Sequence, residues 1–245
     1  MTTRSRLDLL RLWEVGEGQH PIDRALYLLG AAFPELTWEQ LVGLSIGQRD
    51  DLLLALRQRI FGPSLATLAE CPNCGERLEF TLQVPDLRRE RVADFQPLER
   101  TLVVEDVAVR YRLPNSADLA ALVQHTDVSA AREALLRRCV LESRQGETVL
   151  LTADQLPEPV ITALAEDMEA ADPEAELRLD LECPDCGHQW FVLLDILSYL
   201  WTELTAQARH LLRSVHVLAR FYGWREADIL AMSPQRRQLY LEMVS

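Results

Sequence analysis

Two short cysteine pairs carry the clearest chemical signal in this chain. They are C-P-N-C-G at residues 71–75 and C-P-D-C-G at residues 183–187, two near copies of one loop. Two residues between cysteines allow a tight turn to direct both sulfurs at one ion, and the following glycine tolerates the positive φ of such a turn. A closed structural zinc site takes four ligands in a tetrahedron. The sequence therefore predicts one structural Zn²⁺ held by all four thiolates: Cys71, Cys74, Cys183 and Cys186.

Other interpretations of the cysteines stay open at this point. A disulfide or a redox pair is the main rival, although a thioredoxin-like motif needs a strand-to-helix junction that neither loop has. His188 follows the second loop and could replace one cysteine as a ligand. A metalloenzyme would need an open metal position, which a site of four thiolates lacks. The fifth cysteine, Cys139, lies in an apolar helical stripe and is expected to be a small buried hydrophobic residue.

Each cysteine loop adjoins runs that alternate polar and apolar residues, the pattern of a half-buried strand. Residues 77–84 follow the first loop and end at Pro85, while residues 176–181 and 189–194 flank the second loop. This arrangement is typical of a zinc ribbon, in which the metal replaces a core that short strands cannot provide. The unit of knuckle and strand thus occurs twice, as a weak internal repeat.

The segment between the two ribbon halves is predicted to be a small α+β insert. Residues 102–113 indicate a hairpin that turns at Glu105-Asp106. Helices are expected after it, and a proline at position 173 stops the last of them. Their predicted caps are Asn115 or Ser116, then Ser129, then a capping box at Thr152 to Gln155.

Both ends of the chain are predicted to be helical. Pro21 opens one helix, Thr37 begins a capping box, and a longer helix stops at Gly62-Pro63. The strongest helical pattern is at residues 202–222, where apolar residues recur every three or four positions. Two shorter helices are expected between Gly223 and the C-terminus.

These elements predict an α+β fold, with helical N- and C-terminal parts around a split zinc ribbon that carries an α+β insert. Four parts are expected: an N-terminal helical segment, a ribbon in two pieces, the insert, and a C-terminal helical segment. Their bounds are 1–66, 67–85 with 175–195, 86–174, and 196–245.

Composition limits the classes of function. The chain has 245 residues and a net charge of −13, with 38 acidic residues against 25 basic ones, all of them arginine. Because phosphate binding needs clustered positive charge, the acidic balance weighs against a nucleic-acid role. No run reaches the roughly 20 apolar residues of a membrane span, and no signal-peptide pattern is seen. Intact C-x-x-C pairs suit a reducing cytoplasm.

The sequence offers no catalytic constellation. A glycine-rich phosphate loop, an H-E-x-x-H motif and a G-x-S-x-G motif are all missing from it. The five histidines are scattered, and the paired acidic residues are sequence neighbours, which do not face each other on a helix. The prediction is a protein that is not an enzyme and has no small-molecule substrate.

Several stretches resemble a family of baseplate proteins. They include D-L-L-R-L-W-E at residues 8–14, I-G-Q-R-D-D-L-L-L at residues 46–54 and, most specifically, the closing stretch 215–241 with Y-G-W-R-E-A-D-I-L. This is similar to the baseplate hub subunits and hub-assembly chaperones of T-even-type contractile phage tails and bacterial contractile injection systems. The cysteine ribbon departs from the T-even members. The resemblance is weakest in the insert, residues 86–174.

The resemblance implies a structural or assembly role, with other baseplate or hub proteins as partners and incorporation into a phage-tail-like particle. Aromatic residues and arginines dominate interface energies. The candidate anchors are Trp201, Tyr222, Trp224, Arg236, Arg237 and Tyr240, and the alternative is that the aromatic ones belong to the core. A second function stays open: a zinc-ribbon adaptor that binds nucleic acid or the transcription machinery. A basic face on the ribbon would favour it, and the surroundings of the loops are mostly acidic.

Overall fold

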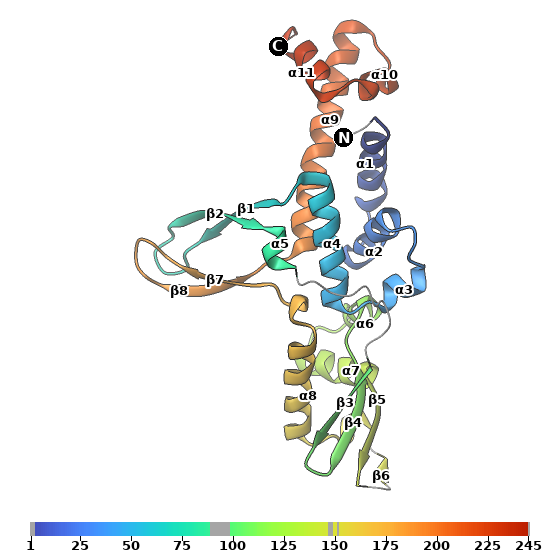
Figure 1. Cartoon of the computed structure of the whole chain (residues 1–245), viewed down its shortest axis with the longest axis vertical. Coiled ribbons are helices and arrows are strands. Elements are labelled where there is room, and N and C mark those ends of the chain that lie inside the picture. The colour runs from blue at the N-terminus through green and yellow to red at the C-terminus, as the bar shows by residue number, and fades with distance from the viewer. Residues whose placement is uncertain (1–2, 89–98, 147–148, 151, 245) are drawn as a thin grey trace. The chain divides into compact units, whose positions relative to one another are not determined.

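The computed structural model describes residues 3–88, 99–146, 149–150 and 152–244 (Figure 1). It confirms the predicted α+β class, since helices occur together with three small antiparallel sheets in the described part of the chain. Two compact units form, one from residues 1–28 with 196–245 and the other from residues 29–195. The division into four parts that the sequence indicates stays a prediction.

The first unit is helical. It contains α1 (Thr3–Gly16), the start of α2 (Pro21–Ala32), α9 (Ile196–Tyr222), α10 (Glu226–Ala231) and α11 (Pro234–Glu242). Proline opens α2 and α11, where its missing N–H has no partner to lose. One face of α9 is buried at spacings of three and four, and the helix begins six residues before the predicted start. Buried residues at 196, 197 and 200 continue the same apolar face and extend the helix.

The second unit begins with two helices that follow capping boxes. Thr37 caps α3 (Trp38–Gly43) as predicted, and Ser45 caps α4 (Ile46–Phe61) in the same way. A carboxylate reaches this helix start from far along the chain. Asp172 accepts a hydrogen bond from Ser45 Oγ at 2.9 Å and another from the backbone N–H of Gly47 at 2.8 Å. The N-terminus of α4 is therefore tied to the short 3₁₀ turn at Pro173–Ala175.

A four-stranded sheet forms the core of the insert. Its strands β3 (Glu99–Val104), β4 (Val107–Arg112), β5 (Val140–Gln145) and β6 (Val149–Leu150) pair in sequence order. The predicted hairpin joins β3 to β4, and its turn places Glu105 at φ +54°. One sheet face packs on α8 (Glu158–Ala171). The buried residues of this core are Val107, Val109, Tyr111, Leu113, Leu156, Val160 and Leu164.

Helix starts in the insert differ in part from the prediction. Asn115 caps α6 (Ser116–Leu122), one of the two residues expected. The predicted cap Ser129 is wrong, because Asp127 accepts from the N–H of Ala130 at 2.8 Å and starts α7 (Val128–Cys139) two residues earlier.

The capping box at Thr152 opens only a 3₁₀ turn, at Ala153–Gln155. The residue before a proline avoids helical dihedrals, so Leu156 is extended and α8 starts only after Pro157.

Two hairpins carry the cysteine loops. The first pairs β1 (Ser64–Glu70) with β2 (Arg77–Gln83), and the second pairs β7 (Arg178–Glu182) with β8 (Gln189–Leu193). Strand β1 has no counterpart in the sequence prediction, whereas the other three lie within two residues of it. Figure 1 shows both hairpins with their loops at the same end. A short helix, α5 (Val84–Leu87), follows β2 at the predicted proline stop.

Candidate metal centre

The two cysteine loops adopt the same backbone structure. In each, the N–H of the glycine donates to the carbonyl of the first cysteine at 2.9 Å: Gly75 to Cys71, and Gly187 to Cys183. Both glycines have the positive φ that the sequence predicts, +78° and +68°. The N–H of each first cysteine is also bonded to a carbonyl beyond the loop, at 2.8 Å and 2.9 Å. The repeat seen in the sequence is therefore a structural repeat.

The structure brings the four predicted ligand residues together. The sulfurs of Cys71, Cys74, Cys183 and Cys186 all lie within 4.8 Å of one another. Two close separations join different loops: 3.7 Å from Cys71 to Cys186, and 3.5 Å from Cys74 to Cys183. Zn–S bonds of about 2.3 Å at tetrahedral angles place sulfurs roughly 3.8 Å apart. The observed spacing fits one metal ion with four thiolates.

The rival interpretations fit this geometry less well. A redox disulfide would join the two cysteines of one loop, and its S–S bond would be about 2.05 Å long. His188 lies outside the group of clustered donor atoms, and its ring stacks on Trp190 with centroids 6.0 Å apart. Cys139 is fully buried, as predicted, and burial raises the pKa of its thiol to about 12.

Hydrogen bonds within the cluster distinguish its thiols. The Asn73 side-chain amide donates to Sγ of Cys186 at 3.5 Å and lowers the pKa of that thiol to about 6. The backbone N–H of Glu76 donates to Cys74, but desolvation and hydrogen bonds to the neighbouring thiols raise the pKa of Cys74 to about 12. Asn73 was not among the residues predicted from the sequence. Its position between the cysteines, where the second loop has Asp185, is the signal that could have shown it.

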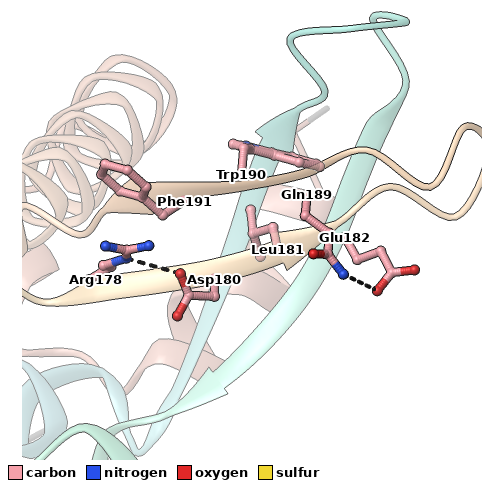
Figure 2. Close-up of a pocket in the computed structure, with 7 residues that line it drawn as sticks. All are labelled: Arg178, Asp180, Leu181, Glu182, Gln189, Trp190 and Phe191. Carbon is pink, nitrogen blue, oxygen red and sulfur yellow. Dashed lines mark hydrogen bonds and ion pairs between the residues drawn. The ribbon is translucent and has the colours of Figure 1, made fainter.

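The outer face of the second hairpin is charged. Figure 2 shows Arg178 and Asp180 in an ion pair, 2.9 Å apart, and Gln189 donating to Glu182 at 3.2 Å. The Arg178 guanidinium also stacks over Phe191, 4.1 Å from the ring centroid. These residues border a shallow hollow of about 450 Å³. Charged pairs that satisfy one another are typical of a solvated strand face, and the acidic surroundings do not form the basic face that a nucleic-acid adaptor needs.

The predicted partner-binding residues lie in the helical unit. The ring of Trp201 stacks under the Arg24 guanidinium at 4.1 Å, inside the unit. Tyr222 stacks on Trp224 at 4.3 Å, and Tyr240 meets Trp224 edge-on at 4.8 Å. These three rings form one cluster. Arg236 lies over Tyr240 and is exposed, whereas Arg237 is 5% exposed. Their role in binding a partner stays a prediction.

The comparison with known families decides the broad identity. Residues 32–201 match the family model described as T4 bacteriophage base plate protein. The chain belongs to this family. The matched range contains both cysteine loops and the insert, and it stops before the closing stretch 215–241 on which the resemblance rested most. No curated protein and no solved structure matches the chain. Among the described residues, no helix is both long enough and apolar enough to cross a membrane.

Proposed function

We propose that this baseplate-family protein is a non-enzymatic structural or assembly component of a contractile tail or injection-system baseplate, locked by one structural zinc ion. Membership of the baseplate family supports the role. The observation that carries the zinc proposal is the cluster of four sulfurs from two loops more than a hundred residues apart. As a hub subunit or hub-assembly chaperone, the protein would bind other baseplate proteins.

The donor set selects the metal and its task. Thiolates are soft ligands, and a tetrahedral S₄ site suits zinc or an iron centre rather than magnesium or calcium. Four thiolates fill the tetrahedron, so no coordination position is left to activate water. A metal in this position supplies stability instead of chemistry.

The need for such a metal follows from the elements that it joins. An isolated two-stranded hairpin is marginally stable in water, and each loop sits on such a hairpin. The inward side chains of β2, β7 and β8 are only half-buried, for example Phe80 and Trp190, whereas β1 buries Leu65 and Ala69. Because metal-binding energy is folding energy in such sites, the ion would stabilise both hairpins and join them.

The first experiment is metal analysis of the purified protein by native mass spectrometry, before and after treatment with a strong chelator. One zinc per chain is expected, and Cys71→Ser or Cys183→Ser should remove it and lower the melting temperature. The matched control is Cys139→Ala, which alters a cysteine outside the cluster and should keep the metal. Full retention of zinc in both serine variants would contradict the shared site, and iron in place of zinc would correct the identity of the ion.

The baseplate role has its own test. Trp224→Ala removes the central ring of the aromatic cluster, and we expect it to weaken incorporation into the particle while the monomer stays folded. Trp38→Ala is the control, because that tryptophan is 60% exposed and belongs to the other unit. Circular dichroism distinguishes a ring cluster that binds a partner from one that stabilises the core. If the Trp224 variant is unfolded, the cluster belongs to the core.

A further inference from the structure

The exposed face of α9 carries a row of cations. Arg209, Arg213, His216 and Arg220 are spaced by four, three and four residues, so they share one helix face, and all four are exposed. We call this row the α9 basic stripe. Between Arg209 and Arg220 it extends about 16 Å along the helix. The opposite face of α9 is buried, so the stripe faces outward from its own unit.

The stripe has no internal counter-charge. Residues 204–225 contain no acidic residue. Within the part of the chain that the structure describes, no ion pair or hydrogen bond involves the side chain of Arg209, Arg213 or Arg220. Cations in one row on a helix repel each other, since like charges at this spacing are mildly destabilising. An acidic partner would relieve that repulsion.

Charge is distributed unevenly between the two units of the chain. Residues 29–195 contain 15 arginines and 30 acidic residues, whereas residues 1–28 with 196–245 contain 10 arginines and eight acidic residues. The acidic surplus of the whole chain thus belongs to the second unit. Each copy of the protein carries both an unpaired basic helix face and a strongly acidic body.

One hollow in the acidic unit has the complementary chemistry. It measures about 640 Å³ and lies along the C-terminal part of α8. Glu166, Glu169 and Glu176 line it, are exposed, and have no ion pair among the described residues. Arg178 also lines it, but its charge is paired with Asp180. Met168 and Phe191 add apolar surface, and Phe191 is 51% exposed. We call it the α8 acidic hollow.

An exposed aromatic ring lies at the edge of the stripe, near its end. Phe221 follows Arg220 in α9, is turned about 100° around the helix from the stripe, and is 60% exposed. Nucleic acid is the less suitable occupant, because three arginines would have to overcome repulsion from a unit with twice as many acids as arginines.

We propose that the α9 basic stripe of one copy binds the α8 acidic hollow of a second copy. The two surfaces differ, so the contact is heterologous and each copy keeps one free stripe and one free hollow. Such contacts continue into a ring or an open chain of subunits. This proposal does not depend on the metal.

Sedimentation velocity of the full-length protein tests the proposal. We expect reversible self-association at about 0.1 M salt, weakened at least tenfold near 1 M, because the Debye length falls from about 10 Å to about 3 Å. Arg209→Glu/Arg213→Glu/Arg220→Glu should be monomeric, and so should Glu166→Arg/Glu169→Arg. When these two variants are mixed, one intact stripe meets one intact hollow, and a pair should form.

The mixing experiment separates a lost contact from a lost fold, since unfolded variants would not rescue each other. The matched control is Arg110→Glu/Arg137→Glu/Arg144→Glu, which reverses three exposed arginines of the acidic unit and should associate like wild type. The proposal is overturned if wild type stays monomeric up to about 100 µM, which would put any dissociation constant above the weak micromolar range. Association of the stripe variant at wild-type strength, or a mixture that stays monomeric, would overturn it as well.

Discussion

Gly47 illustrates how much depends on a single atom at the residue scale. A Cβ at this position would lie 2.4 Å from a carboxylate oxygen of Asp172 and 2.9 Å from the backbone nitrogen of Ala175. Because real Cβ atoms do not approach other atoms that closely, only glycine allows the 3₁₀ turn at Pro173–Ala175 to pack on the first turn of α4. The buried carboxylate then bonds both Ser45 and the backbone of Gly47.

Gly47→Ala should therefore destabilise the protein by about 2 kcal/mol, the usual cost of overpacking a closed contact. Chemical denaturation followed by circular dichroism measures this loss. Gly43→Ala is the control, because a Cβ at that position meets nothing within 4 Å, and it should be neutral or slightly stabilising. Equal effects of the two substitutions would show that the close approach does not matter.

The residue scale also marks what sequence can reveal. Gly75 and Gly187 were predictable because the positive φ that requires each glycine arises inside a five-residue loop. The role of Gly47 was not, since its partner Asp172 lies 125 positions away and nothing local indicates the contact. The four cysteines were predictable over a similar distance only because their chemistry is incomplete in pairs and complete in fours.

At the scale of elements, one buried carboxylate joins three of them. Asp118 in α6 is fully buried and accepts hydrogen bonds at 2.8 Å from Arg112 of β4 and from Arg138 of α7. It also accepts from the backbone N–H of Asn115 and so closes the helix cap. Burial raises the pKa of Asp118, but these donors outweigh it and the pKa is lowered overall.

The sign of this shift predicts an acid-sensitive insert. A carboxylate whose pKa is lower in the folded state contributes stability above its unfolded pKa of about 3.9, and loses it as the pH falls through the folded pKa. Asp118→Asn should cost about 3 kcal/mol at pH 7, near the low end for a broken buried pair because Arg138 is partly exposed. Its stability should also fall less steeply than that of wild type below about pH 4.

Urea denaturation at a series of pH values measures both effects. Asp154→Asn is the control, since this carboxylate pairs with Arg137 at an exposed site, where a salt bridge contributes at most about 1 kcal/mol. If Asp118→Asn has the stability and pH profile of wild type, the hydrogen bonds of Asp118 contribute nothing to the free energy of unfolding.

Element starts show where local rules suffice. Pro21 was placed because the first helical position needs no N–H. Thr37, and Asn115 as one of two expected residues, were placed because capping depends on residues three positions apart. The rule failed at Thr152, where its own hydrogen bonds form but a proline five residues on prevents a longer helix. Strand β1 was missed because its sequence, S-L-A-T-L-A-E, does not alternate polar and apolar residues, although the burial of its side chains does alternate. Its partners all lie in β2, and no local signal indicates that pairing.

At the scale of the whole molecule, the metal should act on one unit only. All four cysteines lie in residues 29–195, and their sulfurs close a loop that joins positions 109 apart. In the chain-entropy model, a cross-link over about 100 residues stabilises the fold by roughly 4–5 kcal/mol. Its loss would fall on the second unit, since the first contains no ligand.

Hydrogen exchange followed by mass spectrometry can locate this loss. After chelation, amides of β1, β2, β7 and β8 should exchange at least tenfold faster, because each hairpin alone is marginally stable. Amides of α9 should keep their protection, since that helix belongs to the first unit and buries its apolar face within that unit. The sheet of β3, β4 and β5 provides an internal comparison, because its core packs on α8 without the metal. Uniform loss of amide protection over both units would show that the chain unfolds as one cooperative unit. Unchanged protection in the hairpins would show that they stay folded without the ion.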